Sequence, residues 1–424
     1  MATGPLDGVR MLEFSVILAA PFGALHLADL GADIIKVEQP PLGDPSRGIG
    51  GTLPGSSKYW QVIDRGRRAL TVDLSTEAGR EIIYRLLPSI DVVLINYRPG
   101  VAQRLGIDYA TLSAIRPDLI YAEISGYGFE GPMASLAASD MTASAYGGVI
   151  GLTDAYEEDG APRSLHPPIS GDMPSGLAMA LGVTSALYHR QRTGEGQVVR
   201  TSLLRAAMMM TCYNNNVDPV QDPSSRDLVI EAMERARAEG ASYDGIIRAR
   251  QGVRPLNLYF RTFRAKDGGL AMGALTPANR AAIRRTLGLQ GADSDEPGYD
   301  PNNPEHRAMM EVRLEEIRRI LLTATVEEWA DRFNKEGAPV GPVNFPEELL
   351  DDPQASLHYT AVEHPLSGTT YQVAPMVDFS RTPSAVQRYA PLLGEHNAEI
   401  LRDLGYSEQE IAALHEQGVL HAGV

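Results

Sequence analysis

The stretch from Gly8 to Glu38 reads GVRMLEFSVILAAPFGALHLADLGADIIKVE, and it is the best guide to the fold. Two short apolar runs, at 8–14 and 32–38, fit strands, and a helical segment at 21–30 separates them. The alternation continues downstream, with strands expected at 69–73, 91–95, 119–124 and 197–201 and helices at 76–87 and 101–115. Strands that alternate with helices predict a parallel sheet covered by helices.

A dinucleotide-binding domain is the obvious alternative for this pattern. Glu38 ends the second expected strand, where an acidic residue contacts the ribose in such domains. The first strand, however, runs into Ser15-Val-Ile-Leu-Ala-Ala-Pro21, which lacks the GxGxxG turn that a pyrophosphate needs. We therefore expect an α/β chain whose large domain holds a Rossmann-like parallel sheet, and we disfavour a dinucleotide as its ligand.

Composition argues against several classes of protein. The net charge of -16 disfavours general nucleic-acid binding, which needs a broad basic surface. No apolar run approaches membrane-spanning length, and the N-terminus lacks the basic start and apolar core of a signal peptide. The single cysteine, Cys212, permits no intrachain disulfide, and its apolar surroundings at 206–212 predict a buried structural thiol. We expect a cytoplasmic protein with no nucleic-acid or membrane partner.

Changes of pattern along the chain predict three parts. Residues 1–213 are expected to form the large α/β domain. A smaller α+β domain is expected at 214–323, with strands at 256–262 and 270–272 and helices at 227–238, 277–287 and 311–322. Residues 324–424 are expected to return to the large domain and pack on it. A helix at 326–335 would open this return, with Thr325-x-x-Glu328 as its capping box.

One carboxylate stands out, in Ile169-Ser-Gly-Asp172-Met-Pro-Ser-Gly176. Residues 177–192 predict a helix that ends at Gly194, and its small residues allow close approach by a neighbouring backbone. Asp172 fits the N-cap of that helix, which is a common structural role for aspartate. Catalysis is the alternative role, and the other motifs of the chain favour it.

Landmarks of one family recur in order along nearly the whole chain. They include Pro5-Leu-Asp-Gly-Val-Arg-Met-Leu-Glu-Phe14, Leu30-Gly-Ala-Asp-Ile-Ile-Lys-Val-Glu38, Gly43-Asp44, Asn96-Tyr-Arg-Pro-Gly100, Gly171-Asp172, Gly194-Glu-Gly-Gln197, Pro339-Val-Gly-Pro-Val-Asn344 and Gly394-Glu-His396. With them the chain resembles the class III CoA-transferases, a family that includes formyl-CoA and carnitine-type CoA-transferases and the α-methylacyl-CoA racemases. The resemblance implies an interlocked-ring homodimer, and only the segments at about 218–250 and 288–305 fall outside it.

The family's nucleophile is the aspartate of the Gly-Asp pair, which corresponds to Asp172. The resemblance implies that Asp172 attacks a donor acyl-CoA and carries an aspartyl-acyl anhydride and then an aspartyl-CoA thioester. Neither a metal nor an external base is needed, because each nucleophile is already an anion. With a reference pKa of about 3.9, the aspartate is expected to be ionised, and amides at the helix start are expected to stabilise oxyanions. CoA and acyl-CoA are then substrates, with no permanently bound cofactor.

A second aspartate, Asp140, lies where family members place another polar active-site residue. The resemblance implies a supporting catalytic role for Asp140, and a helix cap is the alternative. The racemases carry a histidine immediately before this position and a glutamate further on, where this chain has Ser139 and Thr276. Proton abstraction beside a carbonyl needs a base, and serine cannot serve unaided. These departures favour a transferase over a racemase.

Binding of CoA requires local positive charge in an acidic chain. Arg65, Arg67, Arg68, Arg98 and Arg104 supply candidates, and the resemblance adds Asn96 and Tyr97 as nucleotide contacts. The alternative for each arginine is that it is a solvated charge on the surface and does not contact CoA. Gln39 stands where formyl-CoA transferases have a CoA-contacting arginine, and Leu18 where they have an active-site glutamine, so oxalate and formate are not the expected acids.

The sequence thus predicts an acyl-CoA:carboxylate CoA-transferase that acts on a small organic acid. An arginine-rich run in the small domain, Arg248 to Arg264, leaves a dicarboxylic acid among the candidates, with a solvated surface as the alternative. An acyl-CoA racemase on the same scaffold is the second hypothesis. A non-catalytic CoA-binding subunit of a heteromeric transferase is the third, and the presence of Asp172 disfavours it.

Overall fold

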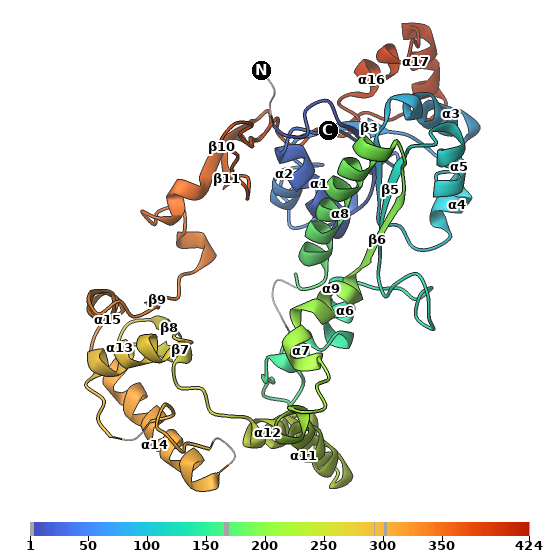
Figure 1. Ribbon diagram of the computed structural model, residues 1–424. Helices are drawn as coiled ribbons and strands as arrows, with labels where there is room; N and C mark the ends of the chain where they lie inside the picture. The colour runs from blue at the N-terminus through green and yellow to red at the C-terminus, as the bar shows by residue number, and fades with distance from the viewer. Residues whose placement is uncertain (1–3, 165–168, 292, 301–302, 424) are drawn as a thin grey trace. The chain divides into compact units, whose positions relative to one another are not determined.

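The computed structural model describes residues 4–164, 169–291, 293–300 and 303–423, and the chain divides into two compact units. Unit 1 comprises Met1–Thr153, Arg163–Asn216 and His358–Val424, and unit 2 comprises Asp154–Pro162 and Val217–Leu357. Figure 1 labels their elements along the chain.

Unit 1 is built on a parallel sheet of six strands (Figure 1). The strands are β1 (Arg10–Phe14), β2 (Asp33–Glu38), β3 (Arg67–Thr71), β4 (Val92–Ile95), β5 (Ile120–Ser125) and β6 (Val198–Ser202). Their order is β3-β2-β1-β4-β5-β6, so the direction of winding reverses between β1 and β4. Open α/β sheets bind ligands at the carboxyl ends of the strands beside such a reversal. The predicted Rossmann-like sheet is confirmed.

Helices cover both faces of this sheet (Figure 1). One face carries α1 (Ala19–Asp29) and α8 (Asp172–Thr193), which share a core with β4 and β5. The other face is covered by α3 (Glu77–Leu86), α4 (Val101–Leu105), α5 (Tyr109–Ile115), α16 (Asn397–Asp403) and α17 (Glu408–Glu416). The single helix expected at 101–115 is two helices, because Gly106 ends α4 with a φ of 68° and the Asp108 carboxylate caps α5.

Helices α1 and α8 pack backbone to backbone where two glycines meet. A Cβ atom on Gly23 would lie 2.5 Å from the carbonyl oxygen of Gly176, and one on Gly176 would lie 2.5 Å from that of Ala19. The expectation that the small residues of the second helix admit a neighbouring backbone is confirmed at Gly176. The crossing places the first turn of α1 beside the first turns of α8.

Several elements of unit 1 had no counterpart in the sequence prediction. They are α2 (Lys58–Ile63), α6 (Asp140–Tyr146), α7 (Val149–Leu152), α10 (Cys212–Asn215) and the hairpin of β10 (Tyr359–His364) and β11 (Gly368–Val373). Helix α9 (Leu203–Met210) directly follows β6. The thiol of Cys212 is exposed, which corrects the prediction of a buried cysteine: the apolar run lies at the end of α9, where Met208, Met209 and Met210 are exposed too.

Unit 2 holds an antiparallel sheet of three strands, β7 (Phe260–Arg264), β8 (Gly269–Gly273) and β9 (Val340–Pro342), in that order. Its helices are α11 (Arg226–Ala238), α12 (Tyr243–Val253), α13 (Pro277–Leu287), α14 (Pro304–Leu321) and α15 (Val326–Lys335). The capping box of Thr325 and Glu328 at the start of α15 is confirmed.

The end of unit 2 corrects the expected domain boundary at residue 323. Helix α15 and strand β9 were assigned to the C-terminal return, but they belong to unit 2 because Trp329, Phe333 and Val340 are buried in its core. Of the expected C-terminal return at 324–424, only the residues from His358 onward belong to unit 1. Among the described residues, no helix has the length and apolar character to span a membrane.

Candidate active site

Asp172 is the first residue of α8, and Gly171 occupies the N-cap position. The Asp172 side chain makes no capping hydrogen bond, so the structural role proposed from sequence is not the one it has. Across the described ranges, no hydrogen bond or ion pair is found for its carboxylate. A partly buried carboxylate without a partner is available for chemistry.

Asp140 provides the cap that Asp172 does not. It begins α6, a helix that Ser139 and Thr142 cap reciprocally, and it is only 5% exposed. Its Oδ2 atom accepts hydrogen bonds from the amides of Gly171 at 2.8 Å and Asp172 at 2.7 Å, and its Oδ1 atom accepts one from the Ser144 hydroxyl. Asp140 therefore fixes the start of α8 from a neighbouring helix.

This cap changes two expectations about the site. The amides of Gly171 and Asp172 are already bonded to Asp140, so they are not open to an oxyanion in this structure. Burial, and then the charge of Asp140, raise the pKa of Asp172 to about 7, whereas the sequence predicted an ordinary, fully ionised aspartate. Desolvation disfavours the anion, and a like charge nearby adds to that effect. Perturbed carboxylates of this kind are typical of active sites.

The loop after β1 reaches the same edge of the sheet. Asn96, which follows β4, accepts a hydrogen bond from the Val16 amide and donates one to the Val16 carbonyl, each at 2.9 Å. Ile17, which follows Val16, has a φ of 66°, and β-branched residues rarely adopt this region. Leu18 then precedes α1, whose first turn lies against Gly176 of α8, one turn beyond Asp172. The loop thus joins the sheet reversal to the start of α8.

Tyr59, on α2, is a residue near Asp172 that the sequence prediction did not name. Burial raises the pKa of its phenol, and the charge of Asp172 is the next cause, which places the two side chains in electrostatic range. The sequence prediction placed no helix at residues 58–63 and named no residue among them. The hairpin β10–β11 supports this segment through a hydrogen bond from Gln61 to Ser367 and a contact between the side chains of Ser56 and His364.

The expected CoA-binding residues fall into two groups. Asn96, Tyr97, Arg98, Arg104 and Gln39 all follow the carboxyl ends of β2 or β4. Arg98 and Arg104 are exposed and, within the described part of the chain, form no ion pair, while Gln39 donates a hydrogen bond to Asp73. Burial raises the pKa of Tyr97 to about 12. These residues share one edge of the sheet, as a nucleotide site there would require.

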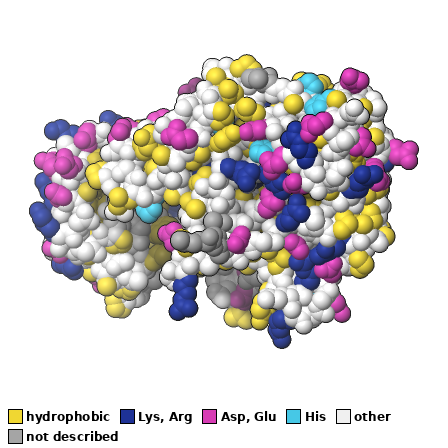
Figure 2. All heavy atoms as spheres, turned by 90° about the horizontal axis from the view of Figure 1, so that it is seen from above, with side chains coloured by type: hydrophobic (Ala, Val, Ile, Leu, Met, Phe, Trp, Pro, Cys, Tyr) yellow, Lys and Arg dark blue, Asp and Glu magenta, His cyan; other side chains and the backbone are white. Residues whose placement is uncertain are grey.

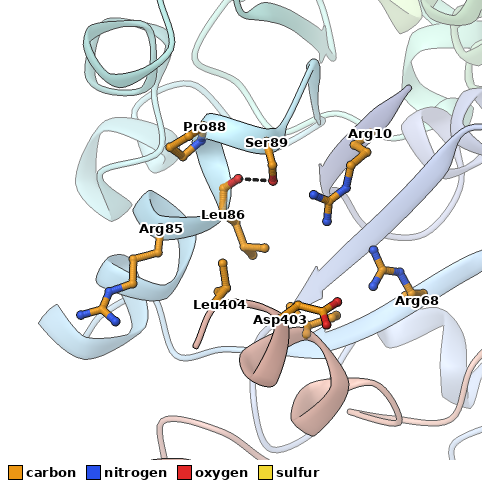
Figure 3. Close-up of a pocket in the computed structure, with 9 residues that line it drawn as sticks. Arg10, Arg68, Arg85, Leu86, Pro88, Ser89, Asp403 and Leu404 are labelled. Carbon is orange, nitrogen blue, oxygen red and sulfur yellow. Dashed lines mark hydrogen bonds between the residues drawn. The ribbon is translucent and has the colours of Figure 1, made fainter. Parts of the chain in front are cut away.

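The other group, Arg67 and Arg68, lies at the opposite, amino end of β3. Arg67 is fully buried and donates to Glu13 and to backbone carbonyl oxygens, so it has no surface to offer a ligand. Arg68 pairs with Asp33 and Glu399 and lines a cavity of about 300 Å³ with Arg10 and Asp403, which Figure 3 shows. Both are structural, which corrects the prediction that they bind CoA. Arg65 is paired with Asp29 in the same way.

The surface gives further context for ligands. On the face drawn in Figure 2, basic side chains are interspersed with acidic ones and form no broad basic field. Among the residues that the structure describes, no group of three or more histidine, cysteine or acidic side chains is arranged to hold a metal ion.

Comparisons with known proteins agree on one family. A family model described as CoA-transferase family III matches residues 6–397. The chain is 32% identical to a succinyl-CoA--D-citramalate CoA-transferase from Chloroflexus aurantiacus, over 98% of each protein. It is also 32% identical to a formyl-CoA:oxalate CoA-transferase from a Bradyrhizobium species, over 99% of this chain and 98% of that protein.

A solved structure matches the fold over nearly the whole chain. It is an aspartate-to-alanine mutant of the Rv3272 protein from Mycobacterium tuberculosis, with a TM-score of 0.74 and 26% identity. The match covers 95% of this chain and 99% of that one.

Proposed function

The chain belongs to CoA-transferase family III and is an enzyme of that class, and from this premise we propose that it transfers CoA between carboxylic acids through covalent intermediates on Asp172. The observation that carries the proposal is the Asp172 carboxylate itself. It is partly buried and has no partner in the described structure. It is held at the start of α8 by the hydrogen bonds that the backbone amides of Gly171 and Asp172 donate to Asp140.

The proposed reaction begins with the acyl-CoA donor. A carboxylate oxygen of Asp172 attacks the thioester carbonyl, and the carbon–sulfur bond breaks. CoA departs as a thiolate, and the acyl group stays on Asp172 as an aspartyl-acyl anhydride. The thiolate then attacks the aspartyl carbonyl carbon, so that the donor acid departs as a carboxylate and an aspartyl-CoA thioester remains. Each step exchanges one anion for another, and no proton has to move.

The acceptor acid reverses these steps. Its carboxylate attacks the aspartyl-CoA carbonyl and expels the thiolate, which then attacks the acceptor carbonyl of the new anhydride and frees Asp172 as a carboxylate. The burial that raises the pKa of Asp172 also supports the reaction, because an anhydride survives only where water is scarce. A pKa of about 7 leaves a large fraction of the carboxylate ionised at neutral pH.

For CoA we propose the residues at the carboxyl edge of the sheet, namely Gln39, Asn96, Tyr97, Arg98 and Arg104. The two exposed arginines are suited to phosphate groups because nothing in the described structure neutralises them. For the acid we propose a small dicarboxylate. Of the four acids in the names of the two relatives, succinate, citramalate and oxalate are dicarboxylic and formate is not. Leu18 argues against oxalate and formate here.

We further propose that the chain acts as a homodimer. Helix α8 carries an exposed apolar stripe of Leu177, Leu181 and Tyr188, which are 40%, 69% and 63% exposed in the single chain. Apolar surface at helical spacing marks an interaction site. Light scattering after gel filtration tests this proposal: a dimer is expected for the wild type and a monomer for Leu181→Glu.

The cytoplasmic location also remains part of the proposal, since one cysteine allows no intrachain disulfide.

Intact mass spectrometry tests the central proposal. The enzyme is incubated with a panel of acyl-CoAs that includes succinyl-CoA, and intermediates are trapped with hydroxylamine or borohydride, with Asp172→Ala alongside. An adduct that maps to Asp172 and is lost in the variant is expected. If no adduct forms and solvent deuterium enters the α-carbon of an acyl-CoA instead, the transferase mechanism is wrong and the enzyme is a racemase.

A further inference from the structure

The loop after β1 holds a conformation that its own sequence disfavours. Ile17 has a φ of 66°, and for a β-branched residue this region carries a steric penalty of about 1–3 kcal/mol. Such a conformation persists only where the surroundings fix it. The Ile17 side chain is 41% exposed, so its packing does not fix the conformation. The hydrogen bonds of the backbone on either side must do so.

Two side chains hold this backbone. Asn96 bonds both the amide and the carbonyl of Val16. The Ile17 amide donates to the carboxylate of Asp44, with both oxygen atoms at 3.2 Å. Asp44 belongs to the loop after β2 and is only 2% exposed. A buried carboxylate therefore supplies the contact at the residue with the unfavourable φ.

Asp44 is itself held on all sides. Its Oδ1 atom accepts hydrogen bonds from the amide of Ser46 at 2.8 Å and from the hydroxyl of Ser46 at 2.7 Å. Its Oδ2 atom lies 3.0 Å from the ammonium group of Lys36, which is fully buried. Its own amide donates to Glu38, which in turn forms a bidentate pair with Arg47. The orientation of the Asp44 carboxylate is thus determined by Lys36 on β2 and by Ser46 in its own loop.

The charge balance around Lys36 indicates that Asp44 is not there to neutralise it. Lys36 lies within 3.3 Å of Glu13 and within 2.8 Å of Asp64 as well as beside Asp44, and Arg67 pairs with Glu13. Three buried carboxylates thus face two cations. Without the charge of Asp44 the cluster would hold two carboxylates and two cations and would be balanced. Of the three carboxylates, Asp44 is the one that binds the Ile17 amide.

We propose that Asp44, oriented by Lys36, is a positioning residue that holds the Ser15–Leu18 loop in the geometry needed for reaction at Asp172. The proposal rests on the proposed function, because it assigns to the loop a place in that site. The path runs from Lys36 through Asp44 to Ile17, into the first turn of α1, and across the glycine crossing to α8. A displaced loop would shift α1 against the start of α8.

The experiment compares Asp44→Asn with the wild type in steady-state transfer from an acyl-CoA that labels Asp172. Asparagine has the same shape, but its NH₂ group replaces one of the two acceptor oxygens. We expect kcat to fall about 10- to 100-fold, while KM for the acyl-CoA changes less than about threefold, because small displacements mainly affect the chemical step. Asp29→Asn is the matched control: it breaks another buried pair of unit 1, Asp29 with Arg65, and should lower the melting temperature with kcat unchanged.

A rescue variant separates positioning from loss of structure. Glycine adopts the φ of Ile17 without steric penalty, so in an Ile17→Gly background the Asp44→Asn substitution should lower kcat less than about threefold. Equal effects of Asp44→Asn with and without Ile17→Gly would overturn the proposal, as would an unchanged kcat in Asp44→Asn. If the wild type forms no adduct on Asp172, the proposed function fails, and the mass measurement shows this separately from the loop variants.

Discussion

The two ends of the parallel sheet in unit 1 handle charge differently. At the amino end, Arg68 pairs with Asp33 and Glu399, and the cavity in Figure 3 is lined by charged groups of both signs. At the carboxyl end, Asp172 has a raised pKa and no partner in the described structure. The carboxylate without a partner is the one that we propose as the nucleophile, whereas the charges at the amino end are neutralised by their neighbours.

The largest expected effect tests this comparison directly. Asp172→Asn removes the nucleophile and should lower transfer activity by at least about 10³-fold, as loss of a covalent nucleophile does in other enzymes. Asp33→Asn, at the amino end, should leave activity within about twofold, because it affects only the partly exposed ion pairs with Arg68 and Arg10. Steady-state rates with one acyl-CoA and one acid measure both. Comparable losses in the two variants would remove the functional distinction between the sheet ends.

The next effect concerns the buried cluster below the carboxyl end. Lys36→Met leaves Glu13, Asp44 and Asp64 without their shared ammonium group, and burial already raises the pKa of Asp64 to about 6. We expect the free energy of unfolding to fall by about 3–5 kcal/mol, because unpaired buried charges are strongly destabilising. Urea denaturation measures it. Arg85→Ala, which breaks an exposed pair with Glu81, is the control, and its denaturation curve should match that of the wild type.

The third prediction sets stability against function at Asp172. The pKa of Asp172 is raised in the folded state, so as pH increases its carboxyl group ionises at a lower pH in the unfolded chain than in the folded one. The wild type should therefore lose stability between about pH 4 and 7 and lose no more above that range. Asp172→Asn removes this penalty and should be more stable at pH 8 by about 1–3 kcal/mol, a figure discounted for partial exposure. Melting curves at pH 5 and 8 test it, and a less stable variant at pH 8 would contradict it.

The smallest effect sharpens the role of Asp140. Because the anion of Asp172 is the proposed nucleophile, kcat/KM should rise with pH through about 7. Asp140→Asn removes a negative charge yet leaves an oxygen that can accept from the amides of α8. The pH at which kcat/KM rises should then be lower, but it should not fall to that of an ordinary aspartate, because burial is the larger cause of the raised pKa. An unchanged pH profile would show that Asp140 acts only as a cap.

Local patterns were sufficient for many features of this chain. The alternation of apolar strands with helices predicted the parallel sheet, and Thr325-x-x-Glu328 predicted the start of α15, because both depend on neighbours in sequence. The Gly-Asp pair directed attention to Asp172 through family resemblance. That family assignment stands on the whole order of the motifs and is supported by the family model over residues 6–397.

Other features depended on partners far apart in the chain. Arg67 and Arg68 begin β3, and distant parts of the chain supply their partners. Arg67 is fully buried against Glu13, and Arg68 pairs with Asp33 at the amino end of β2. Tyr59 and Asp172 are more than 100 residues apart in the sequence, and only the folded chain brings them within electrostatic range. The boundary near 357 depends on Trp329 and Phe333, which read as part of a return until their core is known.

By itself, then, the sequence determined the fold class, the family and the one aspartate on which the chemistry is proposed to depend, since each of these follows from short-range pattern or motif order. Only the tertiary structure decided which charges are paired. The raised pKa of Asp172 and the cap that Asp140 provides for α8 both depend on residues that are distant in the chain. The contacts from Lys36 through Asp44 to Ile17 do so too. Burial and charge separation set these properties, and both are defined by three-dimensional distances.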